Sequence, residues 1–128
     1  MQREVVKEEV KDENFKLVEK VSLGMLPRDK KLKHQATSEI VGRGQVCVDR
    51  TGFTYTGTKN GEPFTFHIDS KNLPTYGMCT DLSRFYTFYQ GEFMEFYPEN
   101  AVVEKIFLAT EEIHRLNGGK WQDFKFRK

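Results

Sequence analysis

The stretch Gly52–Ile68, with the sequence GFTYTGTKNGEPFTFHI, decides the fold that we expect for this chain. Asn60-Gly61 is a preferred two-residue type I′ turn, because both central residues of such a turn need a positive φ. The turn fixes the register of the two flanking strands, beginning with Lys59 opposite Glu62. One face of this hairpin then carries apolar side chains and the other carries polar ones; the apolar set is Phe53, Tyr55, Phe64, Phe66 and Ile68, and the polar set is Thr54, Thr56, Thr65 and His67.

The composition favours a single domain with an aromatic core. The chain has 128 residues, which is the length of one domain and long enough to bury a core. Every aromatic residue except Phe15 lies at or after Phe53. We therefore expect a charged N-terminal extension over residues 1–14, helical over about 3–13, and a single domain over residues 15–128.

Charge, hydropathy and cysteine content argue against nucleic acid as a partner and against a membrane span, and they indicate the compartment. The net charge is +1, which gives no electrostatic footprint for nucleic acid. No apolar run approaches the roughly 18 residues of a membrane span, and no signal-peptide pattern follows Met1. Cys47 and Cys79 lack a CxxC spacing, so we expect free thiols in a reducing, cytoplasmic compartment, with a disulfide between them as the alternative. A membrane role of this chain would therefore be peripheral.

Further strands are predicted on the N-terminal side of the hairpin. Residues 15–23 alternate between apolar and polar side chains, as a half-buried strand does. Residues 24–35 are predicted to form a loop. Residues 37–48 hold one or two strands, which Gly42 and Gly44 interrupt with a bulge or a tight bend.

A second hairpin is predicted on the C-terminal side. Residues 69–72 form a polar break, and residues 73–78 form a loop or a short edge strand, because Pro74 cannot donate to a strand ladder. The strands 84–89 and 92–97 follow. A loop at Gln90-Gly91 sets their register, and the expected cross-strand pairs are Phe88 with Phe93, Tyr86 with Glu95, and Phe85 with Phe96.

The clearest helix is predicted after Asn100, a favourable N-cap residue. It ends at Asn117-Gly118-Gly119, and the aromatic tail 120–126 is expected to pack back on the body. Its apolar stripe is Val102, Ile106, Ala109, Ile113 and Leu116, widened by Val103 and Phe107, and its polar face is Glu104, Lys105, Glu111, Glu112 and Arg115.

The order of these elements predicts a mainly β (α+β) fold. A bent antiparallel sheet or open barrel has one apolar face to cover, and one C-terminal amphipathic helix can cap it. This is the plan of pleckstrin-homology-like and GRAM-like domains. A fold of this kind does not by itself define a function.

No arrangement in the sequence predicts catalysis. The three histidines, His34, His67 and His114, have no Ser or Cys nucleophile at a motif spacing, so we expect structural or solvent-exposed roles. Three scattered histidines and two distant cysteines give no metal-binding spacing, and no cofactor is predicted. The segment 42–45, Gly-Arg-Gly-Gln, lacks the further residues of a phosphate-binding loop.

One charged cluster is a candidate binding site. The segment 28–34 contains the basic residues Arg28, Lys30, Lys31 and Lys33. Between early strands of a pleckstrin-like fold such a loop can face anionic lipid headgroups, and each basic residue near an anionic surface contributes about 1 kcal/mol. The alternative is a solvated loop whose charge is balanced by acids elsewhere.

From Gly52 onward the sequence resembles the C-terminal accessory region of bacterial 1-acyl-sn-glycerol-3-phosphate acyltransferases. The hairpin stretch itself carries part of this resemblance. The other matching stretches keep the order and a similar spacing, and they are residues 71–74 (KNLP), 85–93 (FYTFYQGEF), 96–100 (FYPEN), 109–116 (ATEEIHRL) and 119–122 (GKWQ).

The resemblance implies a module rather than an enzyme. These acyltransferases act through a His that is followed five residues later by an Asp, in an N-terminal domain. Here His34, His67 and His114 are followed at that spacing by Glu39, Asn72 and Gly119. No catalytic residue is therefore carried over, and the acyl transfer to lysophosphatidic acid would belong to a domain of the parent protein outside this chain.

Two functions remain open at this point. In the first, the module docks the parent enzyme on the inner face of the cytoplasmic membrane through anionic lipid, or binds and regulates the parent's catalytic domain. In the second, it is a protein-interaction scaffold without lipid contact, with Tyr86, Tyr89, Trp121 and Phe124 at its interface. An independent enzyme would need His67 or His114 brought together with Cys47 or Cys79.

Overall fold

The computed structural model describes residues 8–25, 39–78, 84–89, 92–99, 103–120 and 125–126, and it describes no side chains for residues 74–78, 88–89, 92–93 and 125–126. Its elements are β1 (Lys16–Met25), β2 (Glu39–Asp49), β3 (Gly52–Lys59), β4 (Glu62–Asp69), the 3₁₀ helix η2 (Ser70–Thr75), β5 (Tyr76–Met78), β6 (Phe85–Tyr89), β7 (Glu92–Pro98), α2 (Val103–Leu116) and β8 (Lys125–Phe126). Residues 8–11 are also helical.

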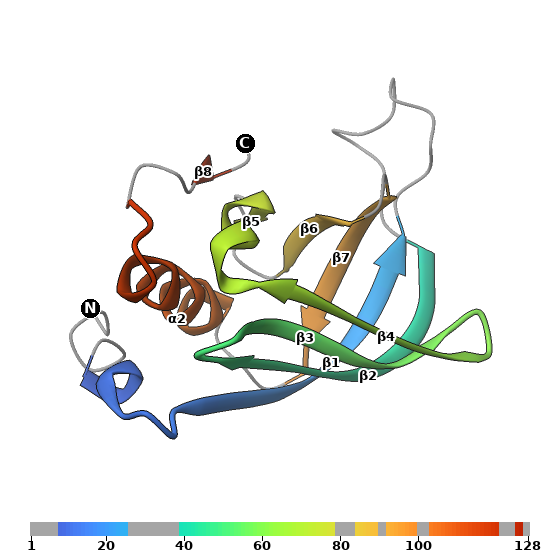
Figure 1. Ribbon diagram of the computed structural model, residues 1–128. Helices are drawn as coiled ribbons and strands as arrows, with labels where there is room; N and C mark the ends of the chain where they lie inside the picture. Colours follow the sequence, from blue (N-terminus) through green and yellow to red (C-terminus); the bar gives the residue numbers. More distant parts are fainter. Residues whose placement is uncertain are drawn as a thin grey trace.

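The strands form one curled sheet in the order β4-β3-β2-β1-β7-β6-β5-β8. All neighbouring strands are antiparallel except β5 and β8, which are parallel. Figure 1 shows the sheet bent into a half-barrel with α2 at one end. The predicted mainly β fold with one C-terminal helix is therefore confirmed.

The hairpin of β3 and β4 has the predicted turn and register. Asn60 and Gly61 have φ values of 55° and 82°, as a type I′ turn requires. Lys59 pairs with Glu62, Tyr55 with Phe66 and Phe53 with Ile68. The predicted apolar face is buried apart from Phe64, which is half-buried, and the polar face is exposed apart from Thr54, which is half-buried.

The second predicted hairpin is confirmed as β6 and β7. The cross-strand pairs are those that the loop at residues 90–91 predicts, including Phe85 with Phe96 and Tyr86 with Glu95. Both faces of this hairpin are buried near its middle, because Tyr86 and Glu95 are only 9% and 3% exposed on the face opposite Phe85.

Of the alternatives predicted for residues 37–48, the structure has one strand with a bulge beside Gly42. β2 runs continuously through Gly42 and Gly44, and the ladder with β1 shifts register where Val41 has no partner. A Cβ on Gly42 would collide with the Thr58 carbonyl oxygen, and one on Gly44 with the Thr56 carbonyl oxygen. The glycines therefore let β3 approach β2 closely where the sheet curls.

The loop boundaries also differ from the prediction. Gly24 and Met25 extend β1 and are not part of a loop. Asp69 belongs to β4, and residues 70–75 form η2, in which Leu73 is fully buried. β5 is a short strand, as predicted, but β8 pairs with it, so it is not an edge strand. This pairing also confirms that the end of the tail packs back on the body.

An aromatic cluster fills the half-barrel. Phe96 is its centre, with ring centroids 5.2 Å from Phe85, 5.5 Å from Phe53, 5.6 Å from Tyr55 and 6.2 Å from Phe66. These rings come from four strands, β3, β4, β6 and β7, so the cluster ties distant parts of the sheet together.

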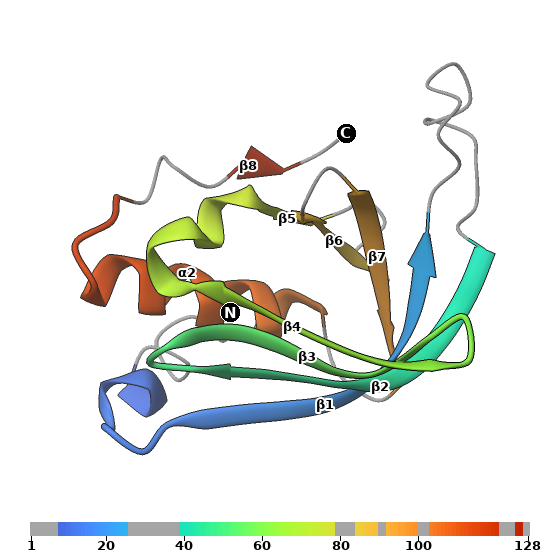
Figure 2. The same ribbon diagram turned by 45° about the vertical axis from the view of Figure 1, so that its right-hand side comes forward.

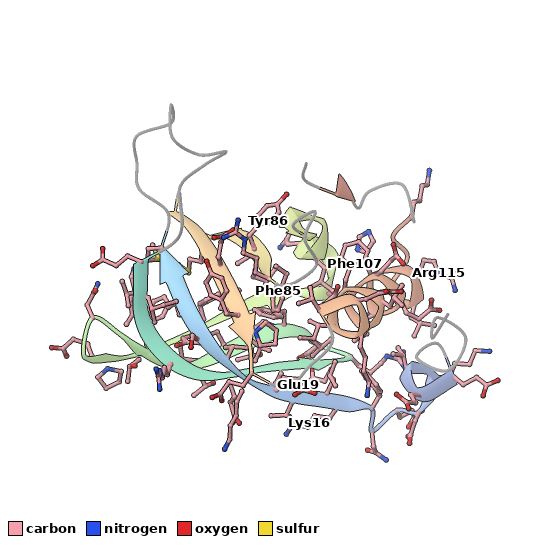
Figure 3. The ribbon with its side chains drawn as sticks, turned by 180° about the vertical axis from the view of Figure 1, so that it is seen from behind. Lys16, Glu19, Phe85, Tyr86, Phe107 and Arg115 are labelled. Carbon is pink, nitrogen blue, oxygen red and sulfur yellow. The ribbon has the colours of Figure 1, made fainter. Side chains whose placement is uncertain are left out.

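The helix α2 closes one end of this core. It packs against η2 and the strands β2, β3 and β5. Figure 3 shows Phe107 of α2 and Phe85 of β6 in the space between helix and sheet. Val10, in the helical residues 8–11, is fully buried in the same core, so the charged N-terminal segment contributes a core side chain.

The predicted polar face of α2 is partly wrong. Glu111 and Glu112 are only 3% and 7% exposed, whereas Leu116 of the expected apolar stripe is 38% exposed. Helical periodicity assumes that one face meets solvent, but a helix at the end of a half-barrel is covered on several sides. Asn100 and Val102 lie outside the described residues.

The predicted end of α2 is confirmed. Gly118 has a φ of 94°, the Gly118 N–H donates to the Arg115 carbonyl, and the Gly119 N–H donates to the His114 carbonyl at 2.8 Å. These bonds form a Schellman motif, which satisfies the last carbonyl groups of a helix. A Cβ on Gly119 would collide with the imidazole ring of His114.

Candidate functional site

The end of the half-barrel away from α2 brings two hairpin tips together. The Asn60 N–H, in the turn between β3 and β4, donates a 2.7 Å hydrogen bond to the Val41 carbonyl of β2. Figures 1 and 2 show this end of the sheet remote from α2 in both views. We call this end the rim and define it by Met25, Ile40, Val41, Arg43, Lys59 and Phe64.

The rim has an apolar part. Ile40 is 48% exposed, the largest exposed fraction of any large apolar side chain among the described residues. Met25, Val41 and Phe64 are half-buried and pack against the edge of the aromatic core. The apolar surface of Met25, Val41 and Phe64 therefore continues from the core to the tip of the sheet. Ile40 pairs with Gly24, so it lies on the opposite face of the sheet from Met25.

The rim also carries charge. The Lys59 ammonium nitrogen lies 5.0 Å from the centroid of the Phe64 ring, within cation–π range. Arg43 is exposed, and its backbone N–H donates to the Thr58 hydroxyl at 3.2 Å. Two exposed acids belong to the same end of the sheet: Glu62 pairs with Lys59, and Glu39 pairs with Met25.

The predicted basic cluster is attached to this rim. Arg28, Lys30, Lys31 and Lys33 lie outside the described residues. The structure does fix the two ends of their segment, because Met25 pairs with Glu39 across the β1–β2 ladder. Residues 26–38 therefore leave and re-enter the sheet at the rim.

The charge of the chain is uneven as a result. Six basic and three acidic residues are found in the segment 26–38 and the rim, when Glu39 and Glu62 are included, which is a net charge of +3. The whole chain has a net charge of +1. The remaining residues are therefore net negative.

His67 has a structural role among its neighbours on the convex face. Its Nδ1 lies 2.8 Å from the Thr54 hydroxyl, and its Nε2 lies 3.2 Å from the Thr51 carbonyl oxygen. With Nε2 protonated, both ring nitrogens are satisfied, and the ring links β4 to the β2–β3 turn.

His114 and Cys47 are also engaged in the fold. The buried His114 ring donates from Nδ1 to the Ser70 carbonyl at 3.1 Å and so joins α2 to η2.

Cys47 is a free thiol. Its burial is the main cause that raises its pKa, and the nearby Asp49 carboxylate is the second, so the thiol stays protonated at neutral pH. β3 separates Cys47 from His67, so the structure does not pair them. His34 and Cys79 lie outside the described residues.

One buried polar cluster was not predicted from the sequence. The Glu95 carboxylate accepts a hydrogen bond from the Tyr97 hydroxyl at 3.1 Å and lies 3.4 Å from the Arg84 guanidinium. The Arg84–Glu95 ion pair neutralises a carboxylate that is 3% exposed, which explains how this face of β7 can be buried.

The aromatic residues predicted for a protein interface are only partly described. Tyr86, across from Glu95, is 9% exposed and so is a poor interface residue. The side chains of Tyr89, Trp121 and Phe124 lie outside the described residues.

Two features are absent from the part of the chain that the structure describes. No group of three or more His, Cys, Asp or Glu side chains there could hold a metal ion. No described helix is both long and apolar enough to span a membrane.

No family model matches this chain, and no similar protein is found among curated proteins.

Proposed function

We propose that this chain is a non-catalytic module, similar to pleckstrin-homology and GRAM domains, that docks a phospholipid-synthesis acyltransferase on the anionic inner face of the cytoplasmic membrane. Acyl transfer to lysophosphatidic acid would take place in another domain of the parent protein. The observation that carries the proposal is that Met25 and Glu39, the residues on either side of the basic segment 26–38, pair with each other at the rim.

Two further observations support it. The sequence from residue 52 onward resembles the accessory region of these acyltransferases. The rim, which flanks the basic segment in the sequence, lies at the end of the half-barrel away from α2. Each basic residue near an anionic membrane contributes about 1 kcal/mol, so the four cations together are enough for weak, reversible docking.

Co-sedimentation with vesicles tests the proposal. The vesicles contain phosphatidylcholine with phosphatidylglycerol as the anionic lipid, and vesicles of phosphatidylcholine alone give the baseline. The triple variant Lys30→Gln, Lys31→Gln, Lys33→Gln is expected to bind about 100-fold more weakly, because it loses roughly 1 kcal/mol at each position.

A charge-matched variant is the control. Lys11, Lys16 and Lys20 are exposed and precede or lie in the part of β1 away from the rim, so replacing all three by Gln removes the same charge elsewhere. This control is expected to bind within about threefold of the wild type, a loss smaller than 1 kcal/mol. An equal loss of vesicle binding in both triple variants would mean that binding depends on net charge and not on the segment 26–38. No binding by the wild type would overturn membrane docking and favour contact with the parent's catalytic domain.

A further inference from the structure

We propose that β4 pairs with β4 of a second copy of this chain, so that two sheets join edge to edge in an antiparallel dimer. This inference goes beyond the proposed docking and does not depend on it. It is carried by the backbone groups on the outer side of β4.

β4 is the last strand on one side of the sheet, and β3 is its only strand partner among the described residues. Figure 2 shows β4 at this boundary of the curled sheet. The opposite boundary is β8, which has only two residues and is too short for a stable ladder. An eight-residue edge strand such as β4 presents a row of N–H and C=O groups to which another strand can bind.

The turn determines which backbone groups of β4 point outward. Lys59 and Glu62 flank a two-residue turn and form a hydrogen-bonded pair, and such pairs alternate along the ladder with pairs that are not hydrogen-bonded. The N–H and C=O groups of Thr65 and His67 therefore point away from β3. The described residues supply no hydrogen-bond partner for these backbone groups.

The outer edge of β4 has little of the protection that natural edge strands carry. Charged side chains, proline or a bulge on an edge normally prevent pairing with another chain. Pro63 removes one outward N–H beside the turn, but residues 63–68 (PFTFHI) contain no Lys, Arg, Asp or Glu. This part of β4 is therefore open to pairing.

The edge is complementary to itself in one antiparallel register. A two-fold axis beside Phe66 places Thr65 opposite His67 of the second copy, and each of the symmetry-related pairs can exchange both N–H···O=C bonds. An axis beside Thr65 would instead place His67 opposite Pro63, which has no N–H to donate. We therefore assign the axis to Phe66.

The concave face of β4 adds an apolar contact in this register. Phe64 is half-buried and packs against the edge of the aromatic core. It would lie opposite Ile68 of the second copy, in a pair without hydrogen bonds, where the side chains of two strands come closest. The second copy would therefore cover part of Phe64 that the single chain leaves in solvent.

Antiparallel pairing points the two rims in opposite directions. Only one rim of the dimer could then contact a given flat bilayer. Dimerisation and membrane docking are therefore separate properties, and either proposal can fail without the other.

Sedimentation equilibrium of the full chain over a range of concentrations tests the dimer. Thr65→Pro removes an outward N–H at a position where an edge strand tolerates proline, as it does at Pro63. This variant is expected to raise the dissociation constant by about 10-fold to 100-fold, because two symmetry-related hydrogen bonds are lost. Thr65→Val keeps the N–H and is expected to dimerise as the wild type does.

Two double variants test the register, and both lose the same His67 side-chain contacts. Thr65→Lys with His67→Lys places like charges opposite each other across the axis, so this variant is expected to be a monomer. Thr65→Lys with His67→Glu places opposite charges there, so this variant is expected to dimerise.

Amide hydrogen exchange locates the contact. The N–H groups of Thr65 and His67 are expected to exchange more slowly as the protein concentration rises, because they become bonded only in the dimer. Phe66 is the internal control. Its N–H faces β3, so its exchange is expected to be equally slow at every concentration.

Three results would overturn the proposal. The first is a wild type that stays monomeric at every concentration. The second is a dimer that persists both in folded Thr65→Pro and in the double-lysine variant, because the contact would then lie on another surface. The third is slow exchange at Thr65 and His67 that does not depend on concentration, because another part of the same chain would then cover the edge.

Discussion

At the scale of single residues, Asp69 stands at the junction of β4 and η2. Its Oδ1 accepts hydrogen bonds from the Lys71 N–H at 3.1 Å and from the Ser70 hydroxyl at 3.3 Å. The Lys71 N–H is the main reason why the pKa of Asp69 is lowered below its ordinary value of 3.8. The carboxylate therefore acts as the N-terminal cap of η2.

This lowered pKa gives a pH-dependent stability. The contribution of Asp69 is fully present above its unfolded pKa of 3.8, and it is lost as the pH falls through the lower pKa of the folded state. Asp69→Ala is expected to lower the midpoint of urea unfolding at pH 7, and the difference from the wild type should shrink at pH 3. Asp69→Asn keeps an acceptor without the charge, so its midpoint should fall less. A difference that stays constant with pH would contradict the assignment.

Residue-scale predictions succeeded where a side chain depends on its own hairpin and failed where it depends on distant parts of the chain. His67 lies on the polar face that the turn at residues 60–61 predicts. Glu111 and Glu112 were expected in solvent and are buried, because the burial of a helix side chain depends on every element packed around the helix. The exposure of Ile40 was also missed, since no local pattern tells which end of a half-barrel a residue occupies.

At the scale of elements, the β3–β4 turn depends on the left-handed conformation of Asn60, with φ of 55°. Alanine in this conformation costs about 1–2 kcal/mol, whereas glycine adopts it without that penalty. Asn60→Ala is therefore expected to reduce the free energy of unfolding by about 1 kcal/mol, and Asn60→Gly by much less. Chemical denaturation measures both variants.

The Asn60→Gly variant shows whether the backbone conformation or the side chain of Asn60 stabilises the turn. The hydrogen bond from residue 60 to Val41 uses the backbone N–H, so both variants keep it. If Asn60→Gly were as unstable as Asn60→Ala, the Asn side chain and not the backbone conformation would stabilise the turn.

The elements also show why some strands were predicted and others were not. The two hairpins have short connections, so local turn chemistry set their registers correctly. β2 was predicted as one or two strands because glycine in a strand normally weakens it; here Gly42 and Gly44 make room for the backbone of β3. The two-residue strand β8 is parallel to β5, and no local pattern indicates such a pairing.

At the scale of the whole molecule, the aromatic cluster holds the sheet in its curled shape. Phe96 is fully buried and contacts rings from β3, β4 and β6. Phe96→Ala is expected to reduce the free energy of unfolding by about 3–5 kcal/mol, the usual cost of removing a buried ring. Phe64→Ala, at a half-buried position of the rim, is the comparison and should cost clearly less.

Thermal and urea unfolding measure both losses. A similar loss in the two variants would mean that the half-barrel is held equally by its rim and its centre. It would also count against an exposed apolar surface at the rim, because Phe64 would then behave as a core residue.

The contact between His114 and Gly119 has a consequence for sequence variation. The imidazole ring occupies the space that any side chain at position 119 would need, and the same ring holds the Ser70 carbonyl. During evolution, position 119 therefore cannot drift away from glycine unless position 114 changes with it. Such a paired change would also release η2 from the helix, so positions 114 and 119 form one unit under selection.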